Sequence, residues 1–488
     1  MTLVLHGRVT PEQRLRDPYL TLPFDLPEGA EAVEVRYCHD AGSVLDLGLV
    51  DPRLGPFPSR EGFRGWSGGA RAHVMLTRTR ATPGYLAGPL PGGRWHVLLG
   101  LAAVAEAGCS YRVEVTVHLG REPADVPGLA ATPGGGAPSA AAPTTPSDGP
   151  GWYRADLQSH SHHSDARGSL HDLQAMALAR GLDVLAVTDH NTVSHHAPLE
   201  ALASPALLWL PGMEVTTYRG HANVWGVDGW VDFRIRSQAD IDTLIDHVHA
   251  RGGLFSVNHP KTSPGCIGCD WEYAIPAGID CLEAWQGPWF LRNWESLARY
   301  DALLRAGRRV TLVGGSDRHQ PPLPDDDPPA LQLGSPTTWL WLETRSEAGV
   351  LDALRGGRVS VSEQPDGPFV SIEAGRTGMG GLLRGAAERR ARALVHRGVG
   401  ERLRWIGAAG VLREVAIDDD RFEDSWTLRS VGPFVRAEVV AATTTLAARR
   451  EALERAARAR GLPRGLDGAA PFRQPYRLAL SNPVYLGA

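Results

Sequence analysis

The hydrophobic pattern divides the chain into parts of different periodicity. In residues 1–120, apolar and polar residues alternate with a period of two, as in Val33–Tyr37 and Tyr111–Val117, and Gly or Pro residues lie between such runs. This alternation is typical of β-strands with one buried face. Because no long helical pattern interrupts it, we expect a β-sandwich or jelly roll.

Residues 121–150 differ in composition, since 12 of these 30 positions are Pro or Gly and Ala, Ser and Thr fill much of the rest. Such a stretch has too few large apolar residues to form a core. It predicts a linker between two folded parts, semi-extended where the prolines cluster.

Residues 151–362 alternate between short apolar runs and helical patterns. Runs that are apolar on both faces are typical of strands in a parallel sheet covered by helices. The expected strands are 152–158, 183–188, 207–210, 254–257 and 310–313. The expected helices are 170–180, 237–250 and 289–306. Repeated βα units of this size predict an α/β barrel or a relative of one.

After Pro365 the period of two returns, so residues 363–488 are expected to form a C-terminal β-rich domain. The expected strands there are 369–373, 402–405 and 435–439. An amphipathic stretch at 446–460 is the exception. In it, Glu451 and Arg455 have the i,i+4 spacing that stabilises a surface helix.

The composition, with 43% hydrophobic and 22% charged residues, is that of a soluble globular protein. A net charge of −5 gives no reason to expect a nucleic acid or a membrane as partner, so we expect a small-molecule substrate. We find no signal-peptide pattern and no run of 18 apolar residues, which favours a cytoplasmic protein. Five cysteines, an odd number, argue against a disulfide framework. The oligomeric state stays open.

Residues suited to metal binding follow five of the apolar runs, and 12 of the 18 histidines lie between residues 160 and 319. The five segments are Asp156–Asp165, Val187–His190, Pro211–Glu214 with His221 after it, Val257–Pro260, and Gly314–His319. In a parallel barrel the carboxyl ends of all strands meet on one face. Imidazoles and carboxylates gathered there suit Zn, Mn or Fe, and carboxylates that can bridge suggest more than one ion.

Each segment also has a simpler interpretation. Asp165 and Asp189 could be helix N-caps, and Glu214 could be a surface loop residue. His221 and His259 could be hydrogen-bonded histidines of the core. All these interpretations would have to hold together at five strand ends, so a metal centre is favoured.

The five segments resemble the signatures of the PHP (polymerase and histidinol phosphatase) domain, which are D-L-H-x-H-x-x-x-S-D, T-D-H, G-x-E, H-P and S-D-x-H. The order and spacing agree over about residues 155–320. Stretches at 214–223, 282–289 and 480–485 are similar to those of CehA/McbA-type metallohydrolases. The resemblance implies a distorted (βα)₇ barrel with flanking N- and C-terminal β-rich, sandwich-like domains. It also implies two or three metal ions and mainly phosphoester hydrolysis, although a few such enzymes cleave aryl carbamates.

Carried over position by position, the resemblance implies eight metal ligands. They are His160, Asp165, His190, Glu214, His221, His259, Asp317 and His319. Glu214 resembles the bridging carboxylate. The implied sets are His160, Glu214 and Asp317 for the first metal, Glu214, His221 and His259 for the second, and Asp165, His190 and His319 for the third.

Gln158 departs from the family pattern, which has a histidine at this position. The amide oxygen of glutamine is a weak metal ligand. Glutamine also lacks the second ring nitrogen through which a hydrogen-bond partner orients a histidine ligand. We therefore expect a weakened first metal site and one to three ions per chain. Four further histidines outside the signatures are expected in exposed loops or as partners of ligands: His162, His163, His195 and His196.

Lys261 and Arg318 lie beside ligands and could stabilise an anionic substrate, although ordinary surface charge would explain them almost as well. Cys266 and Cys269 form a single CxxC pair. Without a second pair, two ordinary thiols are favoured over a zinc site.

The sequence thus favours a metal-dependent hydrolase of a phosphoester, in which metal-activated water attacks phosphorus. Hydrolysis of a carbamate or carboxyl ester at the same centre is the alternative reaction. A catalytically weak relative with a binding or scaffolding role is the alternative of another class.

Overall fold

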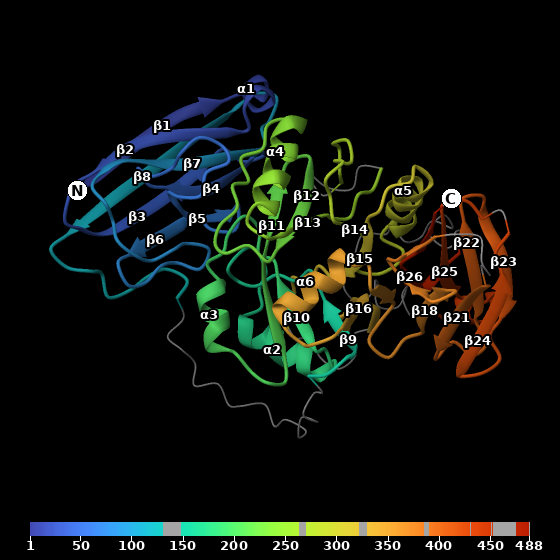
Figure 1. The fold of residues 1–488 in the computed structure, drawn as a ribbon. Helices are drawn as coiled ribbons and strands as arrows, with labels where there is room; N and C mark the ends of the chain where they lie inside the picture. Colours follow the sequence, from blue (N-terminus) through green and yellow to red (C-terminus); the bar gives the residue numbers. More distant parts are fainter. Residues whose placement is uncertain are drawn as a thin grey trace.

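The computed structural model describes residues 1–129, 148–262, 270–321, 329–384, 390–429, 431–449, 451 and 475–487. Most of the expected linker, both cysteines of the CxxC pair and most of the helix expected at 446–460 lie outside these residues. Residues 443–449, at the start of that stretch, are helical. The fold is mixed α/β, with β-rich parts on either side of a central part that carries most of the helices (Figure 1).

The N-terminal part consists of two antiparallel sheets of four strands each. The first is β1 (Thr2–Val9), β8 (Cys109–Leu119), β3 (Ala30–His39) and β6 (His73–Thr77). The second is β2 (Tyr19–Leu26), β7 (Gly93–Ala103), β4 (Val44–Val50) and β5 (Phe63–Gly68). Their inward residues, such as Val35, Leu47 and Leu99, are fully buried in one apolar cluster. Two sheets packed on a shared core make a β-sandwich, and both strands predicted there are confirmed.

One short helix, α1 (Pro11–Arg16), joins the two sheets. Thr10 caps it by accepting a hydrogen bond from the Gln13 backbone N–H, and Pro11 occupies its first turn. The helix buries no residue, so it leaves the sandwich core unchanged.

Seven strands form the central part in the order β15-β14-β13-β12-β11-β10-β9. They are β9 (Gly151–Asp156), β10 (Val184–Val187), β11 (Leu208–Thr217), β12 (Gly220–Trp225), β13 (Leu254–Val257), β14 (Cys281–Gln286) and β15 (Thr311–Gly315). The five predicted strands are confirmed, but β12 and β14 were not expected.

The expectation of parallel pairing throughout is wrong at β12. This strand is antiparallel to both β11 and β13, whereas β9, β10 and β11 pair in parallel, as do β13, β14 and β15. Only Tyr218 and Arg219 separate β11 from β12. Two residues can close an antiparallel hairpin but cannot make the long crossover that parallel strands need.

The first and last of these seven strands meet just beyond their C-terminal ends. Ser159 forms a parallel bridge with Arg318. The backbone N–H of His160 donates to the carbonyl of Arg318 (3.0 Å), and the N–H of Asp317 donates to that of Gln158 (2.9 Å). These bonds bring the first and fifth ligand segments together, although more than 150 residues separate them.

Among the described residues, several helices accompany the central strands and the strand that follows them, β16 (Thr337–Leu342). They are α2 (Leu170–Ala179), α3 (His196–Ala201), α4 (Gln238–His249), α5 (Asn293–Arg305), the 3₁₀ helix η1 (Pro329–Leu331) and α6 (Glu347–Arg355). The expected capping box of α4 is present, since Ser237 and Asp240 bond each other's backbone N–H groups. Helix α5 begins later than expected, at Asn293, because Arg292 adopts a left-handed conformation.

The central sheet continues into the C-terminal part. β16 (Thr337–Leu342) pairs antiparallel with β9, and β17 (Val359–Ser362) pairs with β16. The sheet then runs through β26 (Arg477–Ser481), β25 (Phe434–Val440), β22 (Arg402–Gly407) and β23 (Gly410–Ala416). The order of strands therefore crosses the expected boundary at residue 362 without a break.

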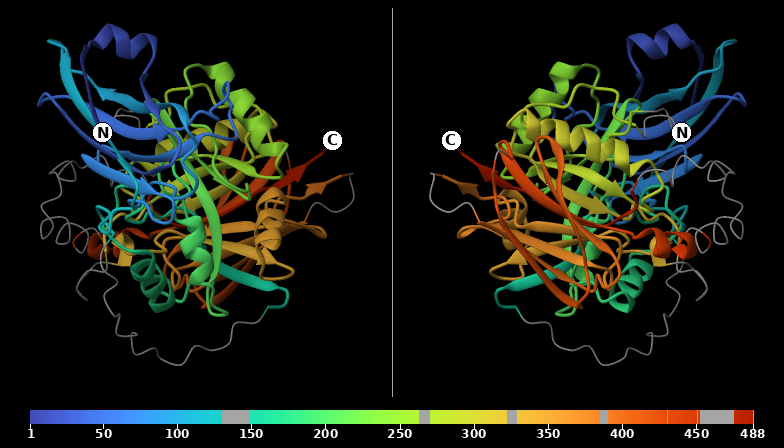
Figure 2. Two further views of the ribbon diagram at one scale, coloured as in Figure 1. Left: turned by 90° about the vertical axis from the view of Figure 1, so that its left-hand side faces the viewer. Right: turned by 90° about the vertical axis from the view of Figure 1, so that its right-hand side faces the viewer.

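A second C-terminal sheet packs beside this one (Figure 2). It contains β19 (Thr377–Gly378), β18 (Phe369–Ala374), β21 (Arg390–His396) and β24 (Arg421–Thr427). A small parallel pair is formed by β20 (Leu382–Leu383) and β27 (Val484–Leu486). All three strands predicted in this part are confirmed as β18, β22 and β25.

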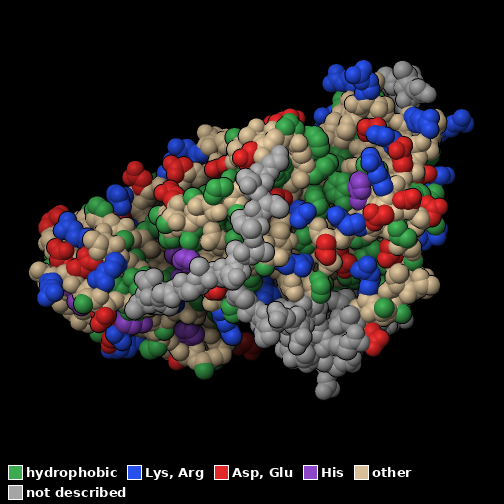
Figure 3. Space-filling view, turned by 90° about the horizontal axis from the view of Figure 1, so that it is seen from below, with side chains coloured by type: hydrophobic (Ala, Val, Ile, Leu, Met, Phe, Trp, Pro, Cys, Tyr) green, Lys and Arg blue, Asp and Glu red, His purple; other side chains and the backbone are tan. Residues whose placement is uncertain are grey.

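The surface carries both signs of charge. Seen from below, acidic and basic side chains are interspersed over the face that Figure 3 draws. No helix among the described residues combines the length and apolarity that a membrane crossing requires. Cys38, Cys109 and Cys281 are free thiols.

The N-terminal sandwich packs against the central part through an aromatic contact. Phe63 of β5 stacks on Trp230, with ring centroids 4.6 Å apart and an interplanar angle of 4°. The hydroxyl of Tyr19 donates to the carbonyl of Phe233 (3.0 Å), and the Ser59 N–H donates to Asp232 (3.0 Å). These contacts fix the sandwich against the central strands.

We predict that Phe63→Ala destabilises the protein by about 3–5 kcal/mol, because it leaves a cavity beside Trp230. Thermal or denaturant unfolding measures the change. Leu15→Ala is the control, since Leu15 is 79% exposed on α1 and should alter stability little. Equal unfolding midpoints for the two variants would show that the aromatic contact does not stabilise the interface.

Candidate metal centre

Glu214 lies at the middle of the expected ligands. Its side chain, on β11, is 0% exposed. Four imidazoles approach its two carboxylate oxygens within 3.5 Å: His190 Nδ1 (3.0 Å) and His160 Nε2 (3.4 Å) at Oε2, and His221 Nδ1 (3.4 Å) and His259 Nε2 (3.5 Å) at Oε1. One carboxylate thus faces imidazoles on both sides, as a bridging ligand would.

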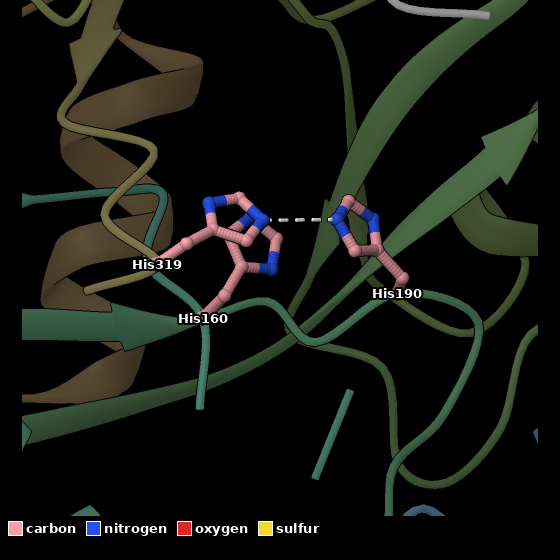
Figure 4. Close-up of side chains that lie close together, drawn as sticks. All are labelled: His160, His190 and His319. Atoms are coloured by element: carbon pink, nitrogen blue, oxygen red, sulfur yellow. Dashed lines mark hydrogen bonds between the residues drawn. The ribbon is translucent and has the colours of Figure 1, made fainter. Parts of the chain in front are cut away.

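The remaining expected ligands complete the cluster. His190 Nε2 and His319 Nε2 lie 3.3 Å apart, and the ring of His160 stacks beside both (Figure 4). Asp165 Oδ1 is 3.6 Å from His190 Nε2 and 3.4 Å from His319 Nε2. Asp317 Oδ1 is 2.9 Å from His160 Nε2. All eight residues are therefore brought together.

Three combinations of these residues place one donor atom each within 4.8 Å of one another. They are His160, His190 and His319; His190, Glu214 and His221; and His160, Glu214 and Asp317. The third combination equals the implied first-metal set, while the other two mix members of the implied sets. These distances therefore define one cluster, and they do not separate the three implied sets from one another.

Two expected ligands have strained backbones. His259 and Asp317 have φ angles of 28° and 52°, and Asn191, directly after His190, has 57°. Residues with a Cβ rarely adopt a positive φ angle, and such backbone strain is found most often at functional sites. The strain is consistent with backbone held in place to aim these side chains.

The charges within the cluster balance one another. Burial disfavours the Glu214 carboxylate, but the imidazoles of His221 and His190 outweigh it and hold the pKa of Glu214 well below its usual value. Burial likewise disfavours protonated His190, yet Asp165 and Glu214 raise its pKa to about 10. Protonated His190 thus offsets the charges of the Asp165 and Glu214 carboxylates, as a bound metal ion would.

Several buried donor atoms of the cluster have no hydrogen-bond partner among the described residues. They are Glu214 Oε2, Gln158 Oε1 and both ring nitrogens of His160, although Glu214 Oε2 lies 3.0 Å from His190 Nδ1 and His160 Nε2 lies 2.9 Å from Asp317 Oδ1. Buried polar groups are rarely left unsatisfied in folded proteins. Imidazole and carboxylate donors suit Zn, Mn or Fe. The residues present therefore fit divalent metal ions.

Gln158 occupies the centre and is 0% exposed. Its Nε2 donates to Glu214 Oε1 (2.9 Å) and to Asp317 Oδ1 (3.3 Å). A Cβ on Gly315 would lie 2.6 Å from the Gln158 Cβ, so glycine is needed there for the close approach of β15 to this side chain. The amide thus bonds two implied ligands of the first metal.

Three residues that we did not single out from the sequence hold the ligands in place. Asn258 Nδ2 donates to Glu214 Oε1 (2.7 Å), Thr216 Oγ1 contacts His190 Nδ1 (2.6 Å), and Gln286 Nε2 donates to Asp317 Oδ2 (2.7 Å). The available signals are that Asn258 directly precedes His259 and that Thr216 lies two residues after Glu214, on the same strand face.

Asp189 does not cap a helix. Its buried carboxylate accepts hydrogen bonds from the Ser161 N–H (2.8 Å), the Ser161 hydroxyl (2.6 Å) and the Ser164 hydroxyl (2.6 Å), and His195 Nδ1 lies 3.1 Å away. It therefore fixes the loop that carries the first ligand segment. Asp165 is not an N-cap either, since Ser169 caps α2.

The four histidines outside the signatures lie around this loop. His195 is fully buried, and its Nε2 contacts the carbonyls of Val187 and Gly212, while His196 Nε2 contacts the latter. His163 Nδ1 contacts the Ser194 hydroxyl (2.8 Å). The expectation of an exposed loop is therefore wrong for His195 and His163, which are buried.

The two cations suggested by the sequence differ in position. Lys261 lines the cavity, and its Nζ donates to Gln286 Oε1 (2.5 Å). Burial lowers the pKa of Lys261 to about 8, while Glu283 opposes the shift. The Arg318 guanidinium instead donates to the carbonyls of Gln320 and Pro321. That geometry makes Arg318 a support of the loop after His319.

Arg292 also lines the cavity and was missed. Its NH2 group donates to Asp270 Oδ1 (3.0 Å). Nothing in its sequence neighbourhood distinguishes it from a surface arginine, because the contact depends on the turn before α5. It is the second cationic side chain facing this space.

A cavity of about 660 Å³ opens onto the cluster. The central part contributes metal-ligand candidates and cations to its wall, and the N-terminal sandwich contributes Asp46, Trp66 and the segment 67–69. The cavity can hold a molecule larger than a metal-bound water, so its size suits a small organic substrate.

No family model matches the chain, and no curated protein does. A solved two-domain protein from Bacteroides vulgatus, containing a predicted PHP-like metal-dependent phosphoesterase, shares 16% identity; the match covers 60% of this chain and 91% of that one, with a TM-score of 0.38. An amidohydrolase from Chromobacterium violaceum, with bound sulfate and no metal, shares 16% identity over 43% and 98%, with a TM-score of 0.27. Neither likeness is close enough to assign a fold or an activity to this chain.

We predict that Gln158→His increases the number of tightly bound metal ions per chain, because an imidazole would replace an amide between Glu214 and Asp317. Metal analysis after gel filtration measures the stoichiometry. Gln174→His on α2, outside the cavity lining, controls for adding an imidazole. A wild-type protein that already retains three ions, one of them on the Gln158 side chain, would contradict the weakened-site interpretation.

Proposed function

We propose that this chain is a metal-dependent hydrolase that acts on a phosphoester. The observation that carries the proposal is the buried Glu214 carboxylate with imidazoles at both oxygens and unsatisfied donor atoms beside it. One buried carboxylate does not require four imidazoles to balance its charge, whereas metal ions are bound by such groups of imidazoles and carboxylates.

We propose further that the seven central strands form the distorted (βα)₇ barrel of a PHP domain, of the CehA/McbA type. The strand order from β15 to β9 and the bridge of Ser159 with Arg318 support a ring that closes on itself. The proposed domains are 1–120, 151–362 and 363–488, joined by the linker at 121–150. The cytoplasmic location and the small-molecule partner remain parts of this proposal.

The metal ions would be held by the eight clustered residues, with Glu214 shared between positions. His221 and His259 would complete one position, and Asp165, His190 and His319 another. At the position of His160, Glu214 and Asp317, Gln158 stands where the family pattern has a further histidine ligand. A divalent metal at such a centre supplies Lewis acidity and lowers the pKa of a bound water.

The protein's own side chains would prepare the ligands and the substrate. Asn258 and Gln158 hold one oxygen of Glu214, which leaves its orientation fixed before a substrate arrives. Gln286 joins Lys261 to Asp317 and so ties the cation to the centre. The reaction would join water to phosphorus and release an alcohol, with the Lys261 ammonium offsetting charge on the phosphoryl oxygens.

Hydrolysis of a carbamate or carboxyl ester is the second candidate reaction. The cavity wall includes the apolar side chains of Val44, Trp66 and Leu291, which would suit an aryl group. The same water could attack a carbonyl carbon in place of phosphorus, so the choice depends on the substrate rather than on the ligands.

We predict that the purified protein contains at least one transition metal per chain, hydrolyses bis(4-nitrophenyl) phosphate and loses thermal stability on chelation. A naphthyl carbamate assayed in parallel distinguishes the two reactions. Preferential cleavage of the carbamate would replace the phosphoester assignment. A metal-free protein that is fully stable, inactive and unresponsive to Mn or Zn would instead support a scaffolding role.

We predict that His259→Ala lowers metal content and reduces turnover by more than about 100-fold, which exceeds the usual effect of a residue that only supports a ligand. His171→Ala is the matched control, because His171 is exposed on α2. Unchanged turnover in His259→Ala would show that this residue is not a ligand.

A further inference from the structure

The N-terminal sandwich forms one wall of the cavity above the candidate metal centre. Asp46 of β4 and Trp66 of β5 line this space together with Tyr218, which lies in the turn between Glu214 and His221. Side chains of the sandwich would therefore contact a substrate bound in the cavity.

Hydrogen bonds connect this wall to the loops that carry the candidate ligands. The guanidinium of Arg71 donates to the carbonyl oxygens of Ser164 (2.8 Å) and His162, on the loop that carries Asp165. Thr192 Oγ1 donates to the carbonyl of Gly84 (2.8 Å), beyond the end of the second ligand segment. The distance from the wall to the cluster is therefore fixed by direct contacts.

Asp46 is the charged side chain that the sandwich presents to the cavity. Its Oδ2 accepts a hydrogen bond from the Tyr218 hydroxyl (2.6 Å). Its Oδ1 accepts none from a described residue, and no described cation forms an ion pair with this carboxylate. Burial raises the pKa of Asp46 to about 6, and the Tyr218 bond limits the rise.

The cations of the opposite wall are bound to groups other than Asp46. Lys261 donates to Gln286, and Arg292 donates to Asp270. An unpaired carboxylate in a partly desolvated cavity repels an anionic phosphoester unless the same molecule brings a positive group to it. Trp66, which is 3% exposed, lines the same space beside it.

We propose that Asp46 is a specificity-determining residue that receives an ammonium group on the organic portion of the substrate. The preferred substrate is then a zwitterionic phosphoester, with its phosphoryl group at the metal cluster and its amine at the sandwich wall. This inference rests on the proposed hydrolase function and adds the chemical class of the substrate.

Two matched phosphodiesters test it: 4-nitrophenyl 2-aminoethyl phosphate and 4-nitrophenyl ethyl phosphate. They share the reacting bonds and the leaving group and differ in the amine. We expect the metal-loaded wild type to prefer the aminoethyl ester by about tenfold or more in kcat/KM, as sites built around a buried polar group do. In Asp46→Asn the ratio should fall towards one, although the amide oxygen can still accept the Tyr218 bond.

Asp25→Asn is the control, because Asp25 lies on β2 of the same sandwich, exposed and paired with Arg94; its ratio should equal that of the wild type. Equal wild-type kcat/KM values for the two esters, or a preference that survives in Asp46→Asn, would overturn the inference and leave the hydrolase assignment standing. The wild-type ratio is decisive even if the variant fails to fold. No turnover of either ester or of bis(4-nitrophenyl) phosphate with Mn, Zn or Fe would overturn the phosphoester assignment, and this inference with it.

Discussion

Glu214 carries a carboxylate that is withdrawn completely from solvent, and a buried charge is strongly destabilising unless its surroundings compensate it. Imidazoles at both oxygens and the amides of Gln158 and Asn258 provide that compensation. Because these partners come from four different strand ends, the carboxylate can be satisfied only when the central strands are assembled. Its environment links the fold to the proposed chemistry.

The topology explains how distant segments reach one residue. The bonds between the segments after β9 and β15 place Gln158 and Asp317 side by side, and the hairpin of β11 and β12 returns His221 towards Glu214. The N-terminal sandwich then covers the cluster from outside, fixed by the stacking of Phe63 on Trp230. The pairing of the strands thus fixes the positions of the candidate ligands, and the docked sandwich fixes the cavity wall above them.

The sequence was most informative where the chemistry depends on local order. The candidate ligands directly follow apolar runs, so the segments that carry His160, Glu214 and Asp317 could be found from the sequence pattern, as could the capping box at Ser237. The assignment of these residues as ligands came from the family resemblance. It was less informative about pairing direction, because a strand such as β12 has the same apolar pattern whether its neighbours are parallel or antiparallel.

Contacts between distant residues were beyond the sequence pattern. Arg318 and Lys261 both lie near candidate ligands in the sequence, yet of these two only Lys261 faces the cavity. The Arg318 guanidinium instead donates hydrogen bonds to the two carbonyls that follow His319. The bond between Tyr218 and Asp46 joins residues 172 positions apart. No periodicity reports such a contact, because it arises from how the sandwich docks.

Anomalous X-ray scattering from crystals grown with Mn or Zn would test the central claim most directly. We expect at least one peak about 2.0–2.2 Å from an oxygen of Glu214, the bond length of carboxylate ligands to zinc. Crystals that bind the metal only elsewhere, with no peak within coordination distance of Glu214, would contradict the account.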